Sequence, residues 1–261
     1  MTYENSTPSD TQKIKALVQG TLAKEQTNNL KKILSSNQNI NIKFIKNKIS
    51  IDENYIYGDE NLSYFDTISP ILIGFFVFFF VFLISGISLL KERTSGTLDK
   101  LLATPIKRSE IVIGYLVGYG IFAIIQTIIV VLFAVYVLGI KIEGSIIYVL
   151  LVNIIIAFIA LSFGTLLSTF ANSEFQMMQF IPIAIVPQIF FSGLIPVDTM
   201  ANWLQAISRI VPLYYGATSL QGIIVKGYTL SNIKFEICIL ILFALVFSLL
   251  NVLSLKRYRK I

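Results

Sequence analysis

Residues 67–90 read TISPILIGFFVFFFVFLISGISLL, a stretch without a single Asp, Glu, Lys or Arg, and 16 of its last 20 residues are Ile, Leu, Val or Phe. At roughly 0.3–0.6 kcal/mol per such side chain, transfer of these residues into a membrane is favourable by about 5–10 kcal/mol. About 20 apolar residues are enough for a helix to cross the roughly 30 Å of bilayer hydrocarbon. We therefore predict a transmembrane helix at residues 69–90 rather than a buried helix of a soluble domain.

Four further stretches lack charged side chains in the same way, at residues 111–140, 144–173, 175–197 and 237–255. They predict transmembrane helices at about 112–138, 146–169, 176–197 and 236–255. Hydrophobic residues make up 55% of the 261-residue chain, and its mean hydropathy is +0.74, which lies outside the range of soluble globular domains. The predicted fold class is an all-α polytopic membrane protein, with five transmembrane helices in a domain at residues 67–255.

The distribution of basic residues predicts the orientation of the chain. An odd number of spans places the two chain ends on opposite sides, so the loop 91–110 and the tail 256–261 share one side, and together they carry nine Lys and Arg. Cationic segments beside spans remain in the cytoplasm. Residues 1–66 carry eight Lys, but residues 49–66, closest to the first span, have five acidic and no basic residues. We therefore expect residues 1–66 to be extracytoplasmic and the tail cytoplasmic.

The extracytoplasmic residues 1–66 are predicted to form a small α+β segment. Apolar residues at helical spacing, Ile14, Leu17, Val18 and Leu22, predict a helix. Alternating apolar residues at 40–44, 49–51 and 55–57 predict short strands. No apolar signal-peptide region precedes this segment. It is expected either to cross the membrane unaided or to depend on a preceding transmembrane helix that this sequence lacks.

The composition excludes several kinds of chemistry. The chain has no His and a single Cys, Cys238, which excludes His-ligated metals, Ser-His and Cys-His dyads and disulfides within the chain. It has no G-x-x-x-x-G-K-[ST] P-loop, so ATP hydrolysis by that route needs a partner. The formal charge is +6, and the excess of basic residues lies beside the apolar stretches. This position favours contact with a membrane surface over binding to nucleic acid. The charge-free stretches contain no ionisable residues except Tyr and Cys, which disfavours ion-coupled transport.

The loop KERTSGTLDKLLATPIKRSE at residues 91–110 combines charge with an apolar helical face. Leu98, Leu101 and Leu102 fall on one side of a short helix that ends before Pro105. A rigid amphipathic helix joined directly to two spans moves with them as a unit. The loop is therefore predicted to transmit a push into the membrane.

The same loop resembles a known family. Residues 92–105, ERTSGTLDKLLATP, followed by EIVIG at 110–114, are similar to the first cytoplasmic loop of type-2 ATP-binding-cassette (ABC) exporter permeases. The resemblance includes YGDENLSYFD at 57–66, FSGLIP at 191–196 and PLYY at 212–215, and covers about residues 55–260. In that family the loop helix is the coupling helix that docks on the ATPase subunit. The resemblance implies this role for Glu92, Gly96, Thr97, Leu98, Leu101, Leu102 and Pro105.

The family pattern also bears on the number of spans. It has six, with one before the extracytoplasmic domain, whereas this sequence shows five. The chain is accordingly expected to be a truncated form, one product of a split gene or a true five-span protein. The family places short re-entrant helices after the fifth span of its pattern, which implies an outer gate in the region 198–227. A surface helix anchored by aromatic residues is the alternative for that region.

Three further groups of residues are candidates. Small residues four positions apart predict close helix packing, within the chain or between subunits, at Gly114, Gly118, Ala160, Gly164 and Ser168. Polar residues at membrane depth are predicted to bond between helices or to line a substrate path, at Gln126, Asn153 and Gln188. Prolines predict a kinked helix, and the aromatic residues that follow predict the outer gate, at Pro182, Pro187, Pro196, Trp203, Tyr214 and Tyr215.

Together these inferences predict the membrane-spanning permease subunit of an ABC exporter in a bacterial plasma membrane. It is expected to form a homodimer or heterodimer of permease subunits, to bind two P-loop ATPase subunits and to contact membrane lipids. The chain itself is expected to be no enzyme and to hold no cofactor, with ATP and Mg on the ATPase. The uncharged path suits an amphipathic drug, a lipid or a lipid-linked molecule. A membrane anchor that assembles an ATPase or envelope complex without transport is the alternative, and a membrane-embedded enzyme lacks candidate acids and bases.

Overall fold

The computed structural model describes residues 2–3, 8–35, 54–55 and 63–254. Two compact units divide the chain, residues 1–67 and 68–261. The first unit contains helix α1 (Pro8–Ser35) and two short strands, β1 (Thr2–Tyr3) and β2 (Asn54–Tyr55), which pair in parallel. The strands predicted between residues 40 and 51, and the tail 256–261, lie outside the described residues.

The second unit is helical over its described residues. Its long helices are α2 (Tyr64–Thr94), α4 (Arg108–Tyr136), α5 (Ile146–Ser168), α6 (Glu174–Ile189) and α9 (Lys234–Ser254). Shorter elements join them: α3 (Thr97–Leu102), α7 (Asn202–Ser208), α8 (Pro212–Lys226), the π-helical turn η2 (Phe190–Leu194) and the 3₁₀ turn η3 (Val197–Thr199). In the described part of the chain, five segments are each long and apolar enough to cross a membrane: α2, α4, α5, α9, and α6 together with η2. The protein is therefore a multi-pass, all-α membrane protein.

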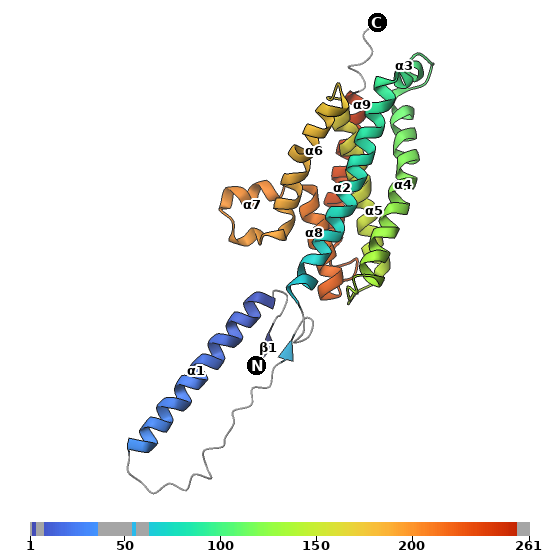
Figure 1. Ribbon diagram of the computed structural model, residues 1–261. Helices are drawn as coiled ribbons and strands as arrows, with labels where there is room; N and C mark the ends of the chain where they lie inside the picture. Colours follow the sequence, from blue (N-terminus) through green and yellow to red (C-terminus); the bar gives the residue numbers. More distant parts are fainter. Residues whose placement is uncertain (1, 4–7, 36–53, 56–62, 255–261) are drawn as a thin grey trace. The chain divides into compact units, whose positions relative to one another are not determined.

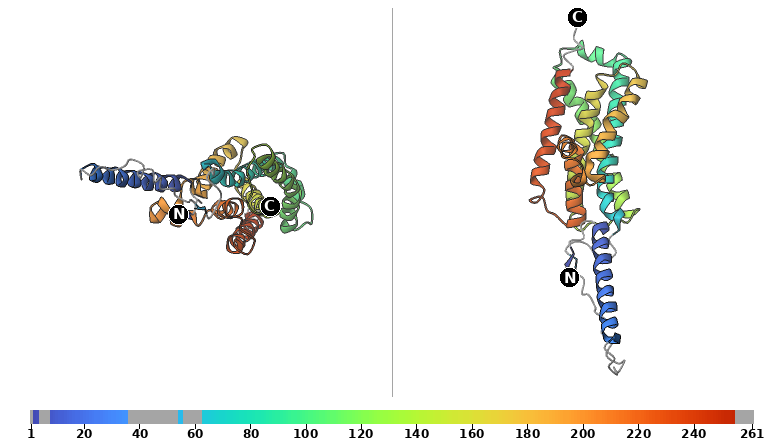
Figure 2. Two further views of the ribbon diagram at one scale, coloured as in Figure 1. Left: turned by 90° about the horizontal axis from the view of Figure 1, so that it is seen from below. Right: turned by 90° about the vertical axis from the view of Figure 1, so that its left-hand side faces the viewer.

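Helix α5 lies at the centre of the bundle, with the other long helices around it (Figure 1, Figure 2). Gly164 brings α5 against α2, since a Cβ added there would lie 2.6 Å from the carbonyl oxygen of Phe82. The rings of Phe163 and Phe247 stack at 4.9 Å and join α5 to α9. On the side of α4, Gly120 leaves room for the ring of Phe158. Small residues and aromatic rings together let three helices pack around one.

The two ends of this bundle are distinct (Figure 1). One end, called the α3 end below, contains α3, the C-terminus of α5 and the last described turn of α9. At the opposite end, the loop between α4 and α5 bonds to the end of α8. The backbone N–H of Glu143 donates to the carbonyl oxygen of Ile224 at 3.0 Å, and that of Gly144 to Ile223 at 3.1 Å.

The segment after α6 returns toward the middle of the bundle. The side-chain oxygen of Gln188, near the end of α6, accepts a hydrogen bond from the backbone N–H of Leu213 at 3.3 Å, so α8 begins beside α6. From there α8 runs to the opposite end. Its 15 residues extend about 22 Å, which is less than the hydrocarbon thickness. Helix α7 projects from the side of the bundle between these two elements (Figure 1).

Helix α6 contains Pro182 and Pro187 and continues through both residues. The predicted irregularity comes a turn later, where η2 widens the helix and Gly193 has φ +98°. Proline removes a backbone donor from the ladder, and glycine adopts positive φ without steric cost. The chain thus changes direction at Gly193, before Pro196, rather than at the prolines inside the helix.

Candidate coupling site at the α3 end

The turn between α2 and α3 depends on Gly96. Its φ of +76° lies in the left-handed region that side chains with a Cβ rarely adopt. The backbone N–H of Gly96 donates to the carbonyl oxygen of Arg93, and its own carbonyl accepts from Lys100 at 3.2 Å, inside α3. Ser95 and Gly96 therefore form the tight turn that separates α2 from α3.

Helix α3 is attached to the bundle through Leu98. This side chain is 1% exposed and packs with Ile111 and Val112 in the first turn of α4. Leu101, Tyr115, Leu116 and Val252 pack around this cluster and are partly buried. Val252 belongs to α9, so the cluster that contains Leu98 joins the short helix to α4 and also contacts α9.

The other residues of the predicted coupling helix have different environments. Thr97 is exposed and its hydroxyl lies 3.0 Å from that of Ser95. Pro105 is exposed after the end of α3, and the side chain of Leu102 lies outside the described residues. Glu92 lies on the last turn of α2 rather than on α3. The loop helix α3 is thus six residues long. Glu92 is not part of its exposed surface but contacts the helix bundle.

Glu92 is held by two tyrosines of α4. Its carboxylate accepts hydrogen bonds from the hydroxyls of Tyr119, at 2.6 Å, and of Tyr115. The two rings stack at 5.9 Å because they are one helical turn apart. No sequence pattern predicted this contact, although Tyr115 and Tyr119 stand four residues apart at the start of a predicted span.

Arg93, the next residue of α2, contacts the C-terminal end of α5. Its Nη1 donates to the carbonyl oxygen of Ala171 at 3.0 Å and to that of Ser168. The last carbonyls of a helix lack partners inside it, and a cation there also interacts favourably with the helix dipole. Glu92 and Arg93 therefore connect the end of α2 to α4 and to the C-terminus of α5.

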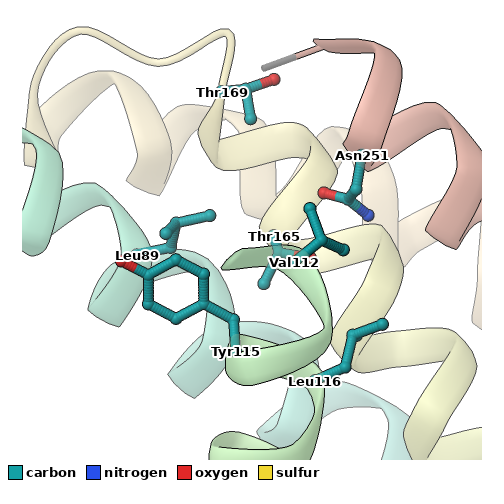
Figure 3. A pocket seen from close by; sticks show the side chains of 7 residues that line it. All are labelled: Leu89, Val112, Tyr115, Leu116, Thr165, Thr169 and Asn251. Carbon is teal, nitrogen blue, oxygen red and sulfur yellow. The ribbon is translucent and has the colours of Figure 1, made fainter. Parts of the chain in front are cut away.

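A small cavity lies next to these contacts, where α2, α4, α5 and α9 meet (Figure 3). Its volume is about 10 Å³, room for about one water molecule. The side chains around it are Leu89, Val112, Tyr115, Leu116, Thr165, Thr169 and Asn251. Asn251 also donates to the carbonyl oxygen of Ser162 at 2.7 Å, which links α9 to α5. The α3 end is thus held by polar as well as apolar contacts.

The predicted packing residues fall into two groups. On α5, Ala160, Gly164 and Ser168 are buried within the bundle. On α4, Gly114 and Gly118 have open space, since an added Cβ at either position meets nothing within 4 Å. The structure thus places the α5 residues at helix contacts within the described chain, whereas the α4 residues are exposed and make no close helix contact there.

The predicted polar path residues do not form a single cluster. Gln126 of α4 lies beside Ser85 and Tyr119 in a shallow pocket. Asn153 is fully buried in α5 and donates to the carbonyl oxygen of Val149 in its own helix at 2.9 Å. Gln188 bonds to the start of α8. None of the hydrogen bonds between described residues joins two of these three.

The predicted gate residues lie along α6, α7 and α8. Pro182, Pro187 and Pro196 are exposed, and Trp203 on α7 is 66% exposed. The hydroxyl of Tyr215 donates to the carbonyl oxygen of Arg209 at 2.9 Å, which ties the start of α8 to the end of α7. Tyr214 and Tyr215 contact each other edge to face at 5.2 Å. Among these residues, Tyr215 is the one that connects two elements.

Comparison with known proteins places this arrangement in a family. Residues 14–225 match the family described as ABC-2 type transporter, and this is most of the chain. The protein belongs to the ABC-2 type transporter family, whose permeases are the membrane components of ABC transporters. The resemblance noted in the loop at 91–110 is thereby confirmed.

Several curated proteins are similar to this chain. Over 177 residues it is 27% identical to the probable multidrug ABC transporter permease YbhS of Escherichia coli, and over 173 residues 29% identical to the permease YbhR. These matches cover 67% and 66% of this chain and 47% of each relative. ABC transporter G family member 20 of Dictyostelium discoideum is 28% identical over 173 residues, 66% of this chain and 24% of the relative. The chain thus spans about half the length of the bacterial relatives and less of the Dictyostelium protein. No solved structure matches it.

Proposed function

We propose that this protein is the permease subunit of an ABC exporter and that α3 is the helix through which a separate ATPase moves it. The observation that carries the proposal is the burial of Leu98 in a cluster with α4 that Val252 of α9 also packs against, while Thr97 and Lys100 on the same helix as Leu98 are exposed. A partner that pushes on the exposed face of α3 would displace both long helices, because a packed leucine cannot slide freely.

The proposed complex places the α3 end in the cytoplasm of a bacterial cell. Two permease subunits, identical or different, would bind two P-loop ATPase subunits, and ATP and Mg would be bound by the ATPases. The basic residues of the loop 91–110 support this orientation. ATP binding would draw the ATPases together, move α3 and open a route between the permease subunits.

The proposed substrate is amphipathic: a drug, a lipid or a lipid-linked molecule. The spans offer apolar and aromatic side chains and neutral amides such as Gln126. The relatives named as probable multidrug permeases support the same class. A charged solute would find no counter-ion there.

Purification in mild detergent is the first test. A P-loop ATPase should copurify in near-equal amount, and its absence would remove the proposal's main support. In the reconstituted complex, Gly96→Val and Leu101→Asp should lower transport-coupled ATP turnover while membrane insertion stays normal. Unchanged turnover would refute the role of α3.

The same complex distinguishes a transporter from an anchor. Addition of amphipathic compounds should stimulate ATP hydrolysis if the permease moves them. A complex that assembles normally but never responds to any such compound would favour a scaffold that positions an ATPase without transport.

A further inference from the structure

A groove of about 270 Å³ lies between α3 and the first turns of α4. Its lining is mainly apolar and consists of Leu101, Ile106, Glu110, Ile111, Gly114 and Tyr115. Gly114 leaves the groove open, since a Cβ added there would meet nothing within 4 Å. Ile106 is 44% exposed at its edge. The described side chains of the protein therefore do not fill this space.

The groove begins at the level where the membrane span starts. The part of α4 that is long and apolar enough to span a membrane is Ser109–Tyr136, and Ile111, Gly114 and Tyr115 belong to its first two turns. Tyrosine is typical of the boundary between hydrocarbon and headgroups. With the membrane surface at the start of this segment, the apolar part of the groove would face hydrocarbon and its edge at α3 would face the headgroups.

The headgroup side carries positive charge. Lys100 and Lys107 are exposed and adjoin the groove residues Leu101 and Ile106 in the chain. Neither lysine takes part in an ion pair among the side chains that the structure describes. The one described carboxylate of the groove, Glu110, accepts a hydrogen bond from the backbone N–H of Lys107 at 3.0 Å and so caps α4. The lysines are left to attract an anion at the membrane surface.

We propose that this groove binds an anionic phospholipid, with one acyl chain along Ile111 and Gly114 and the phosphate beside Lys100 and Lys107. An apolar recess whose lining residues Leu101 and Ile106 are next to two exposed lysines in the chain matches the two parts of such a lipid. A neutral lipid would fill the recess equally well but would gain nothing from the lysines. The bound lipid would hold α3 against α4 at the membrane surface, whether or not the protein transports anything.

The test measures lipids retained by the purified full chain. Protein is reconstituted in nanodiscs of equal phosphatidylcholine and phosphatidylglycerol, and lipids that remain bound are counted by native mass spectrometry. Gly114→Leu fills the recess, and the double variant Lys100→Gln/Lys107→Gln removes the charge. Gly118→Leu and Lys141→Gln are matched controls, because Gly118 also has open space and Lys141 is exposed at the opposite end.

The wild-type protein should retain phosphatidylglycerol in preference to phosphatidylcholine. Gly114→Leu should lose both lipids, whereas the lysine variant should keep a lipid but lose about fivefold of its preference per lysine. Both controls should behave as wild type. Retention by Gly114→Leu equal to that of Gly118→Leu, or an unchanged preference without the lysines, would overturn the proposal. So would a photo-cross-linker at residue 106 that captures only protein, since the occupant would then be a partner subunit.

Discussion

The carboxylate of Glu92 accepts a hydrogen bond from the hydroxyl of Tyr119, 27 residues later, at 2.6 Å. The hydroxyl of Tyr115 donates to the same carboxylate. The end of α2 is thereby fixed to α4 at the α3 end of the bundle. This contact adds a polar connection to the apolar one made by Leu98.

The Glu92 contact predicts energetic coupling between two helices. Glu92→Ala should lower the free energy of unfolding by about 1–3 kcal/mol, because both hydroxyls lose a charged acceptor in a partly buried position. In a double-mutant cycle, Glu92→Gln and Tyr119→Phe should show a coupling energy of about 0.5–3 kcal/mol, measured from thermal unfolding in detergent. Tyr136→Phe, exposed at the far end of α4, is the control and should be additive with Glu92→Gln. Additive effects in both cycles would show that the contact contributes nothing.

The two groups of small residues should respond differently to an added methyl group. Gly164→Ala places a Cβ within 2.4 Å of the Ser85 hydroxyl and 2.6 Å of the Phe82 carbonyl oxygen, so it should destabilise the protein by about 1–3 kcal/mol. Gly118→Ala meets no atom and should leave the melting temperature unchanged or slightly higher, since alanine favours the helix. Equal melting temperatures for the two variants would contradict the packing of α5 on α2.

Substitution of Gly193, in the turn after α6, should change stability only through the backbone conformation. Gly193 has φ +98° and open space around it, so Gly193→Ala meets no clash but strains the backbone. The expected loss is about 1–3 kcal/mol in the free energy of unfolding. Gly118→Ala, a helical glycine with equally open surroundings, is the comparison. A Gly193→Ala variant as stable as wild type would mean that the chain after α6 adopts another path.

The proposed orientation can be tested by labelling. In a Cys238→Ser background, Thr97→Cys and Lys141→Cys place single exposed thiols at opposite ends of the bundle. A membrane-impermeant maleimide should label residue 97 in inside-out vesicles alone and residue 141 in intact spheroplasts alone. Labelling of residue 97 from the outside would place α3 beyond the reach of a cytoplasmic ATPase.

The five membrane helices were predictable because charge-free stretches of about 20 residues leave few alternatives in water. The residues at which these helices end were harder to predict. Helix α2 continues through Lys91, Glu92 and Arg93, since Glu92 bonds to α4 and Arg93 to the end of α5. Those partners are brought near by the fold, and no spacing in the loop 91–110 reveals them.

The same limit applies to the candidate residues elsewhere. Gly114 and Gly164 both belong to small-residue patterns, yet Gly164 packs against α2 and Gly114 lines an open groove. Sequence spacing shows which residues share a helix face, but not which neighbour that face meets. The prolines of α6 likewise predicted an irregular helix, whereas the position of the turn depended on Gly193.

Consecutive residues leave an α-helix about 100° apart around its axis. Glu92 and Arg93 therefore hold the end of α2 from two directions, toward α4 and toward the carbonyls of Ser168 and Ala171. A rotation of α2 about its own axis would break both contacts, whereas a translation shared with its neighbours would break neither. A movement of α2 that keeps both contacts is therefore a joint displacement of three helices, and through Ala171 it extends to the short connection that leads into α6.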